Sequence, residues 1–225
     1  MKNLYGTWWY KYLLNPVMGL FGAIKFNFLF TLFKKKYYSL TEDDLNLLRQ
    51  KLKQHYYVIL NHRKSHLTTY LIGFGNLIKT GKWSYYCHAF MNVDDGTAEG
   101  DEGYKFIEAT AEGVHFSTFM QVFDCDGVVL LRPKGMTDQE YTDLMDKYIA
   151  TTAEQQIGKA YDDLFDLMDD NFQSCVETVR KCLMSMPDYE KRFPNFEATI
   201  KKFGNLTPQM YYDCPDFEVA FEVKK

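Results

Sequence analysis

From residue 41 onward, the chain alternates between short apolar runs and helix-like repeats. The helical spacing of Leu45, Leu48 and Leu52, after a capping-box pair at Thr41 and Asp44, predicts the first helix. Bounded apolar runs predict strands at 56–60, 84–93, 104–110, 114–117, 127–133 and 217–223. Further helices are predicted at 65–81, from 137 to about 151, and from about 174 to just before Pro187. Strands in succession, with helices before and after them, predict an α+β fold.

The first 40 residues follow a different pattern. Residues 7–33 are rich in aromatic and aliphatic side chains, are interrupted by Lys11 and Lys25, and precede three consecutive lysines. The longest uncharged piece, residues 12–24, is too short to span a bilayer, and no signal-peptide pattern is present. Two interpretations are equally favoured: contact with a membrane interface, or an aromatic helix that packs on the rest of the chain or on a partner subunit. We therefore divide the chain into an aromatic and basic segment, residues 1–40, and a domain, residues 41–225.

Composition narrows the class of protein. With 225 residues, 46% of them hydrophobic, the chain can bury one full core. The net charge of -4 argues against nucleic acid as the main partner, because phosphate binding requires clustered cations. Five cysteines without a CxxC pair indicate free thiols in a reducing compartment, and no metal or organic cofactor is expected. The five aspartates within 162–170 lack the spacing of a calcium site and are expected to form a solvated loop.

Cys175 is the first candidate for chemistry. If a helix starts near Ser174, Cys175 lies at its N-terminus, where the dipole and free N–H groups stabilise a thiolate and can form half of an oxyanion hole. Cys182 follows two turns later, beyond the reach of the dipole, and is expected in the core. The alternative for Cys175 is a small buried hydrophobic side chain, and the residues alone favour this alternative slightly.

His88 is the candidate base, because it falls inside a predicted strand that can hold its ring rigidly. Strand alternation places Tyr86, His88 and Phe90 on one face. Glu108, in the next predicted strand, would orient the imidazole. The alternative for His88 is a structural histidine, which is the commoner role for a lone histidine, and His115 is the reserve candidate. The remaining histidines lie at the edges of elements and are expected to be solvated: His55, His62 and His66.

Five segments resemble the motifs of a known family when taken together and in order. They are WSYYCHAFM, FIEATAEGV, GKAYDDLF, QSCVETV and LTPQMYYDCPDFEVAFE. They resemble the permuted papain-like hydrolases, the YiiX-like branch of the NlpC-type cysteine peptidase clan, over about residues 56–222. In that branch the histidine strand precedes the cysteine helix, as His88, Glu108 and Cys175 do here. The resemblance implies a circularly permuted papain-like fold, with an antiparallel sheet packed on helices that include the cysteine-bearing helix.

The resemblance also implies roles for individual residues. Cys175 matches the nucleophile, His88 the base and Glu108 the polar third residue. Tyr161 matches the tyrosine of the Gly-x-x-Tyr-Asp motif, which lies near the thiol and helps to bind the oxyanion. Glu177 matches a structural glutamate two residues after the nucleophile.

The expected function is that of a cysteine hydrolase that cleaves an amide or ester bond through a thioester. Cys87 and Val176 stand where serine is usual in the family, which puts substrate fit in doubt more than the mechanism. The resemblance suggests peptidoglycan peptides, acylated amines or lipids as substrates. Peptidoglycan would require export or carriage in a phage particle, and the expected location is cytoplasmic or virion-associated, with peripheral membrane contact.

Two other classes of function compete with the enzyme. The first is a structural or interaction protein, in a virion or at a membrane, that uses the papain-like fold as a scaffold and residues 1–40 to bind its partner. The second is a membrane-binding module with vestigial chemistry.

Overall fold

A computed structural model describes residues 39–225, except for residues 54, 65, 95–99, 163–170 and 205. The predicted N-terminal segment, residues 1–40, therefore lies outside the described residues apart from Ser39 and Leu40, as do four of the five aspartates of the predicted loop.

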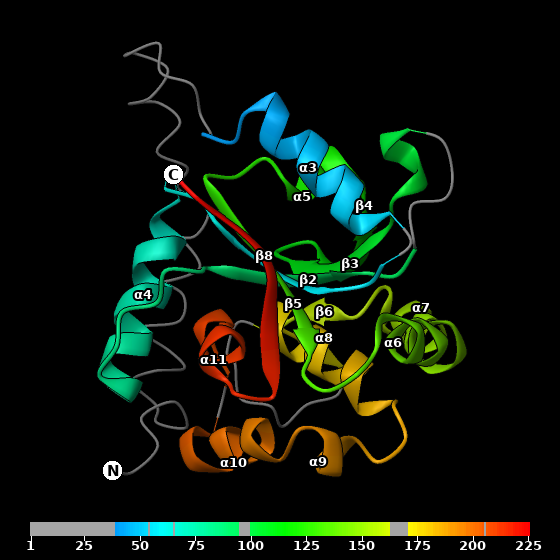
Figure 1. The fold of residues 1–225 in the computed structure, drawn as a ribbon. Coiled ribbons are helices and arrows are strands. Elements are labelled where there is room, and N and C mark those ends of the chain that lie inside the picture. The colour runs from blue at the N-terminus through cyan, green and yellow to red at the C-terminus, as the bar shows by residue number, and fades with distance from the viewer. Residues whose placement is uncertain (1–38, 54, 65, 95–99, 163–170, 205) are drawn as a thin grey trace.

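A six-stranded antiparallel sheet forms the centre of the described part of the chain, in the order β4-β3-β2-β1-β5-β8 (Figure 1). Its strands are β1 (Val58–His62), β2 (His88–Asn92), β3 (Phe106–Thr110), β4 (Gly113–Ser117), β5 (Gly127–Pro133) and β8 (Phe217–Lys224). A separate parallel pair joins β6 (Ala160–Tyr161) to β7 (Phe172–Gln173). The mixed α+β class and the antiparallel sheet are as predicted.

Helices cover both faces of this sheet. They are α3 (Glu42–Leu52), α4 (Leu67–Thr80), α5 (Phe119–Val122), α6 (Asp138–Leu144), α7 (Ala150–Gln156), α8 (Cys175–Met184), α9 (Tyr189–Arg192), α10 (Pro194–Phe203) and α11 (Pro208–Asp213). A 3-10 turn (Asp101–Gly103) precedes β3, and a π-helical turn (Met145–Ile149) joins α6 to α7. Within the described part of the chain, every helix is too short or too polar to cross a bilayer.

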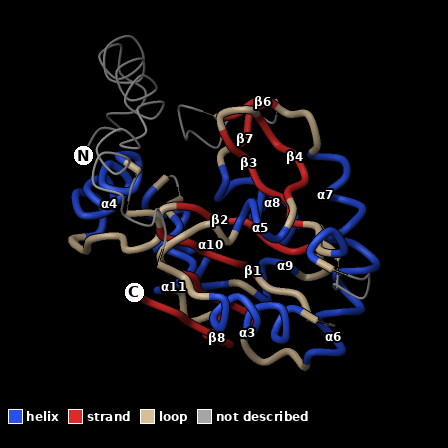
Figure 2. Tube along the Cα trace, turned by 90° about the horizontal axis from the view of Figure 1, so that it is seen from above, coloured by secondary structure: helices blue, strands red, loops and turns tan. Residues whose placement is uncertain are grey.

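Two hydrophobic cores lie on opposite faces of the sheet. One is formed with α3 and α5, and the other with α6 to α11, including Cys175 at the start of α8 (Figures 1 and 2). The helix α4 stands apart from both layers, at one end of the molecule (Figure 2). The helix that begins at Cys175 packs against β2 and β3, and this contact builds the candidate site.

Local sequence signals account for most element boundaries. The Thr41–Asp44 and Thr137–Glu140 capping boxes are both present, and Gly81 closes α4 in the left-handed conformation, with φ 76°. The helix predicted from Thr137 to about residue 151 continues, through the π-helical turn, to Gln156. The short helices α9 to α11 and the parallel β6–β7 pair were not predicted.

The strand predicted at 84–93 begins only at His88. The Tyr85 N–H donates to the Gln209 side chain at 3.0 Å, and the Ser84 hydroxyl donates to the Tyr86 carbonyl at 2.6 Å. These side-chain bonds replace strand pairing around Ser84 and Tyr85, whereas the Cys87 N–H still donates to the Asn61 carbonyl of β1 at 2.9 Å. Tyr86 consequently packs in the core on the α8 side, whereas Phe90 packs in the core on the α3 side, so the prediction that Tyr86 and Phe90 share a face was wrong.

Candidate active site

The helix α8 begins at Cys175, as predicted. Ser174 is the N-cap, and the Glu177 carboxylate accepts hydrogen bonds from the Ser174 N–H at 2.7 Å and from its hydroxyl at 2.5 Å. This capping box satisfies the backbone before the thiol and fixes the direction in which the helix leaves β7. Cys175 therefore occupies the first helical position, where backbone N–H groups and the positive end of the helix dipole face an anion. The residue is only 3% exposed.

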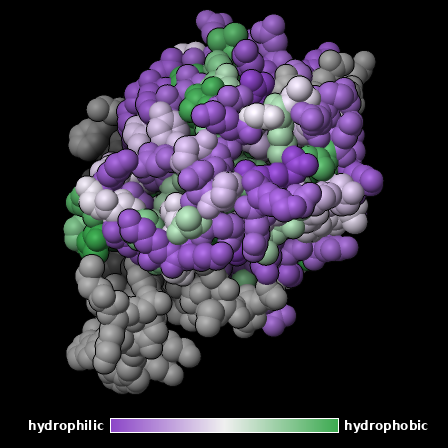
Figure 3. All heavy atoms as spheres, turned by 60° about the horizontal axis from the view of Figure 1, so that its bottom comes forward, coloured by the Kyte–Doolittle hydropathy of each residue, from purple (hydrophilic) through white to green (hydrophobic). Residues whose placement is uncertain are grey.

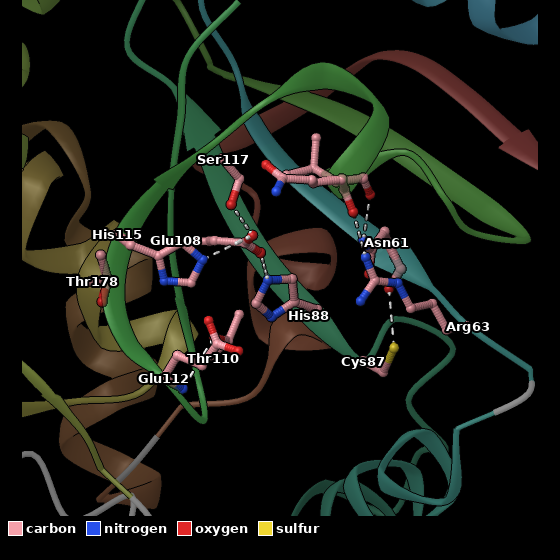
Figure 4. Close-up of polar contacts among 12 residues, drawn as sticks. Asn61, Arg63, Cys87, His88, Glu108, Thr110, Glu112, His115, Ser117 and Thr178 are labelled. Carbon is pink, nitrogen blue, oxygen red and sulfur yellow. Dashed lines mark hydrogen bonds and ion pairs between the residues drawn. The ribbon is translucent and has the colours of Figure 1, made fainter. Parts of the chain in front are cut away.

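Strand β2 presents His88 at its first residue. The His88 Nε2 lies 2.6 Å from Oε2 of Glu108, which belongs to the neighbouring strand β3 (Figure 4). The ring also stacks on Phe90, with centroids 5.7 Å apart. Since a carboxylate only accepts hydrogen bonds, the proton lies on Nε2, and Nδ1 is the ring nitrogen that remains for another partner.

The His88 imidazole interacts with the Cys175 thiol. Burial opposes protonation of the ring, but the charge and hydrogen bonding of Cys175, followed by those of Glu108, raise the pKa of His88 to about 9. Cys175, His88 and Glu108, predicted from three separate segments, are thus brought together in one site.

Glu108 is buried and lies at the centre of one group of polar contacts in Figure 4, between His88, His115 and Ser117. Its Oε1 accepts a hydrogen bond from the Ser117 hydroxyl, and His115 Nε2 lies 3.6 Å from the same oxygen. Burial opposes ionisation of Glu108, but hydrogen bonding and charge from His88, with a further hydrogen bond from Ser117, lower its pKa to about 2. Both carboxylate oxygens are therefore occupied, and the group remains ionised over the neutral range.

The hairpin of β3 and β4 explains how these groups meet. Its register places Glu108 opposite His115 and pairs Thr110 with Gly113, so the turn consists of Ala111 and Glu112, one residue earlier than predicted. Ser117, two residues beyond His115, points to the same side of the sheet. Sequence reasoning missed Ser117 and did not place His115 beside Glu108, although the predicted hairpin register was the signal that could have found both.

Tyr161 lies next to the start of α8 through the parallel pairing of its strand. Its Cα partner is Gln173, two residues before Cys175, and its ring packs against the core that includes Cys175. The adjacent Asp162 is buried, unlike the solvated loop that was predicted for the aspartates. Burial, and then the Asp162 carboxylate, raise the pKa of Glu177 to about 7, against the hydrogen bonds from Ser174.

The prediction that His62 is solvated was wrong. Its ring is buried, its Nδ1 lies 2.5 Å from the Tyr85 carbonyl oxygen, and it stacks on the Tyr85 ring at a centroid distance of 4.2 Å. Burial lowers the pKa of His62, so this histidine favours the neutral form. It supports the segment before His88 and is not part of the polar cluster around Glu108.

All five cysteines are free and buried. Burial raises the pKa of Cys87, Cys125, Cys182 and Cys214, to about 12 for the last two. Among the described residues, no group of three or more His, Cys, Asp or Glu side chains has the arrangement to hold a metal ion.

Comparison with known proteins shows the fold. A scan against models of protein families gives no match, and a search of curated proteins also gives none. Among solved structures, the chain is similar to the metalloprotein YiiX from Escherichia coli O157:H7 (DUF1105), with a TM-score of 0.53 and 19% identity. The match covers 77% of this chain and 99% of the YiiX chain. This protein has a YiiX-like fold.

Proposed function

We propose that this protein is a cysteine hydrolase that cleaves an amide or ester bond through a thioester intermediate. The observation that carries the proposal is the interaction of Cys175, at the first position of α8, with the His88 ring that Glu108 holds. The order of these groups along the chain is that of a circularly permuted papain-like fold, which we propose for the domain. The YiiX-like fold supports this assignment at the level of the architecture alone.

In the proposed mechanism, His88 takes the proton of the Cys175 thiol on Nδ1, while Nε2 remains bound to Glu108. The thiolate attacks the carbonyl carbon of the substrate and forms a tetrahedral oxyanion. The imidazolium then gives its proton to the leaving amine or alcohol as the thioester forms. Water, activated by His88, hydrolyses the thioester and restores the thiol.

The backbone N–H of Cys175 supplies one oxyanion donor in this proposal, because the first N–H groups of a helix have no intrahelical acceptor. Tyr161 supplies the second donor through its hydroxyl, since its strand runs beside the residues that lead into α8. YiiX is a metalloprotein. The described residues of this chain, by contrast, contain no group of three or more His, Cys, Asp or Glu side chains that could hold a metal ion.

The substrate class remains peptidoglycan peptides, acylated amines or acylated lipids. A second candidate function is a structural or interaction protein that keeps the fold as a scaffold. It is favoured by the low exposure of Cys175, which is only 3% accessible to solvent. The two candidates differ in whether a small electrophile reacts faster with Cys175 than with the other buried thiols.

Thiol alkylation, mapped by mass spectrometry on each cysteine, tests the proposal. In the native protein near neutral pH we expect Cys175 to react at least about tenfold faster than the other four, whose pKa values are raised by burial. His88→Ala should slow Cys175 to the rate of the others. Cys175→Ser should retain the fold and lose hydrolysis of a p-nitrophenyl acyl ester.

Cys182→Ser is the matched control, because Cys182 is buried on the same helix outside the site. This variant should lose packing but keep both alkylation of Cys175 and ester hydrolysis. Protein unfolded in urea should label at all five cysteines alike. If the native protein also labels uniformly, or does not label at all, the enzyme is rejected in favour of the scaffold.

A further inference from the structure

The helix α4 has its polar side turned inward and its apolar side turned outward. The buried positions Thr69, Gly73 and Asn76 recur at helical spacing and are small or polar. The exposed positions on the opposite side are apolar: Tyr70, Phe74, Leu77 and Ile78. This arrangement is the reverse of a surface helix in a globular protein, whose apolar stripe faces the core.

The inward side is fixed by specific contacts. Asn76 donates to the Lys82 carbonyl at 2.8 Å and accepts from the Thr207 hydroxyl at 2.6 Å, which ties α4 to the residue before α11. A Cβ on Gly73 would lie 2.5 Å from the Trp83 indole, so only glycine lets that ring pack over the helix. The orientation of α4 is therefore built into the fold, and the exposed apolar side is its consequence.

The outward side and Trp83 together form the α4 surface: Tyr70, Phe74, Leu77, Ile78 and Trp83. Phe74 is 55% exposed, Ile78 67% and Trp83 49%. In Figure 3, hydrophobic residues gather at the left edge, where α4 lies, against a mainly hydrophilic face. Contiguous exposed apolar side chains of this kind mark an interaction site, since isolated ones are normal and clusters are not.

Charge identifies the kind of partner. Residues 63–93, which contain α4 and Trp83, include four Lys or Arg and no acidic residue. Lys79 and Lys82 stand at the C-terminal end of α4, where burial lowers the pKa of Lys79 to about 8 and Lys82 pairs with Asp213 at 3.2 Å. The surface around α4 therefore carries an excess of positive charge, which attracts an anionic partner.

We propose that the α4 surface docks on a bilayer that contains anionic phospholipids, with the helix lying flat in the interface. Exposed aromatic and aliphatic side chains next to lysines are the composition of an interfacial helix. A 14-residue helix is about 21 Å long, too short to cross the ~30 Å hydrocarbon layer. A second copy of the chain is the competing partner, and the mass of the protein in solution distinguishes it from a bilayer. The proposal does not depend on the hydrolase chemistry.

Vesicle binding by the full chain tests the proposal. Trp83 becomes the sole tryptophan reporter when Trp8 and Trp9 are replaced by phenylalanine. We expect its emission to shift to shorter wavelength with phosphatidylcholine vesicles that contain phosphatidylserine, and much less with phosphatidylcholine alone. Lys79→Gln with Lys82→Gln should weaken binding by about fivefold per charge, and Phe74→Glu with Ile78→Glu by at least about tenfold.

Matched control variants separate the α4 surface from general effects. Met120→Glu with Ile157→Glu changes exposed apolar residues elsewhere, and Lys201→Gln with Lys202→Gln removes two exposed lysines of α10. Both pairs should bind like the parent. An unchanged urea midpoint for each variant shows that the fold is intact.

Three results would overturn the proposal. The first is binding that the α4 variants do not weaken. The second is co-sedimentation with vesicles while the Trp83 emission does not move, because residues 1–38 alone would then carry the contact. The third is a lower mass in solution for Phe74→Glu with Ile78→Glu than for the parent, because the α4 surface would then join two copies of the chain.

Discussion

Glu108 is the residue on which the geometry of the site depends. It is buried, and its two oxygens are held by His88 and Ser117 from the neighbouring strands on either side. We expect Glu108→Gln to lower the free energy of unfolding by about 2–3 kcal/mol near pH 6, because it removes a hydrogen bond between charged groups. Urea denaturation at several pH values measures this loss.

The pH dependence of that loss follows from the two pKa shifts. The pKa of His88 is raised to about 9. The stability that protonated His88 contributes to the folded state is therefore full below about pH 6.5 and disappears as the pH rises through 9. The pKa of Glu108 is lowered to about 2, so its contribution is full above about pH 4.5 and disappears as the pH falls through 2. Glu112→Gln, in the exposed turn of the same hairpin, is the control. If the free energies of unfolding of the parent and of Glu108→Gln differ by the same amount at pH 6 and at pH 10, this account is contradicted.

At the residue scale, the sequence predicted which residues belong to the candidate site better than it predicted the contacts between them. Cys175, His88 and Glu108 were predicted as site residues from helix position, strand position and family resemblance. The structure places the three close together, and their catalytic roles stay predictions. Ser117 was missed because a serine in a strand has no distinctive pattern. Its role depends on the hairpin register, which places it beside Glu108. His62 was misplaced because its burial depends on Tyr85, which is far from it in sequence.

At the scale of elements, the start of α8 combines a strong cap with an unfavourable charge. Glu177 caps Ser174, but burial and the Asp162 carboxylate raise its pKa to about 7. A carboxyl with a raised pKa loses stability as the pH rises from its unfolded value, about 4.5, through 7. Glu177→Gln keeps a capping-box acceptor and removes the charge. We expect the free energy of unfolding of this variant to equal that of the parent near pH 5 and to exceed it by about 1–2 kcal/mol near pH 8.

Thermal unfolding at the two pH values measures this crossover. Glu177→Ala is the comparison variant, because it removes the acceptor as well as the charge and should be destabilised at both pH values. Equal destabilisation of Glu177→Gln at pH 5 and pH 8 would show that the carboxylate is needed for the cap and that the repulsion from Asp162 is unimportant.

Element prediction succeeded where the signal was local. The Thr41–Asp44 and Thr137–Glu140 capping boxes, the Gly81 stop and the apolar run of β5 depend only on neighbouring residues, and these were located from the sequence. The late start of β2 depends on Gln209, which lies more than a hundred residues away. The helices α9 and α11 are too short for a helical repeat to emerge, because four to six residues span less than two turns.

At the scale of the whole molecule, the described residues within 39–225 form a six-stranded sheet with a hydrophobic core on each face. Ser39, the first described residue, donates its hydroxyl hydrogen to Asp126 at 2.6 Å. The sequence predicted the α+β class from the order of its elements, whereas the outward turn of α4 was not predicted, because it depends on contacts with Trp83 and Thr207.

We therefore expect a chain that lacks residues 1–38 to fold. Its urea denaturation should be cooperative, because the sheet and the two cores that the described residues form are retained. The slope of the unfolding free energy against urea concentration should fall below the parent's only by the contribution of the removed segment. Binding to anionic vesicles should become weaker, since the deletion removes six lysines together with the aromatic segment. The binding that remains should then depend more steeply on Phe74 and Ile78, because α4 would carry it alone.

A deletion protein that fails to fold would assign residues 1–38 to the core and rule out their role as an interfacial segment. One that folds and binds vesicles as tightly as the full chain would leave α4 as the whole of the membrane contact.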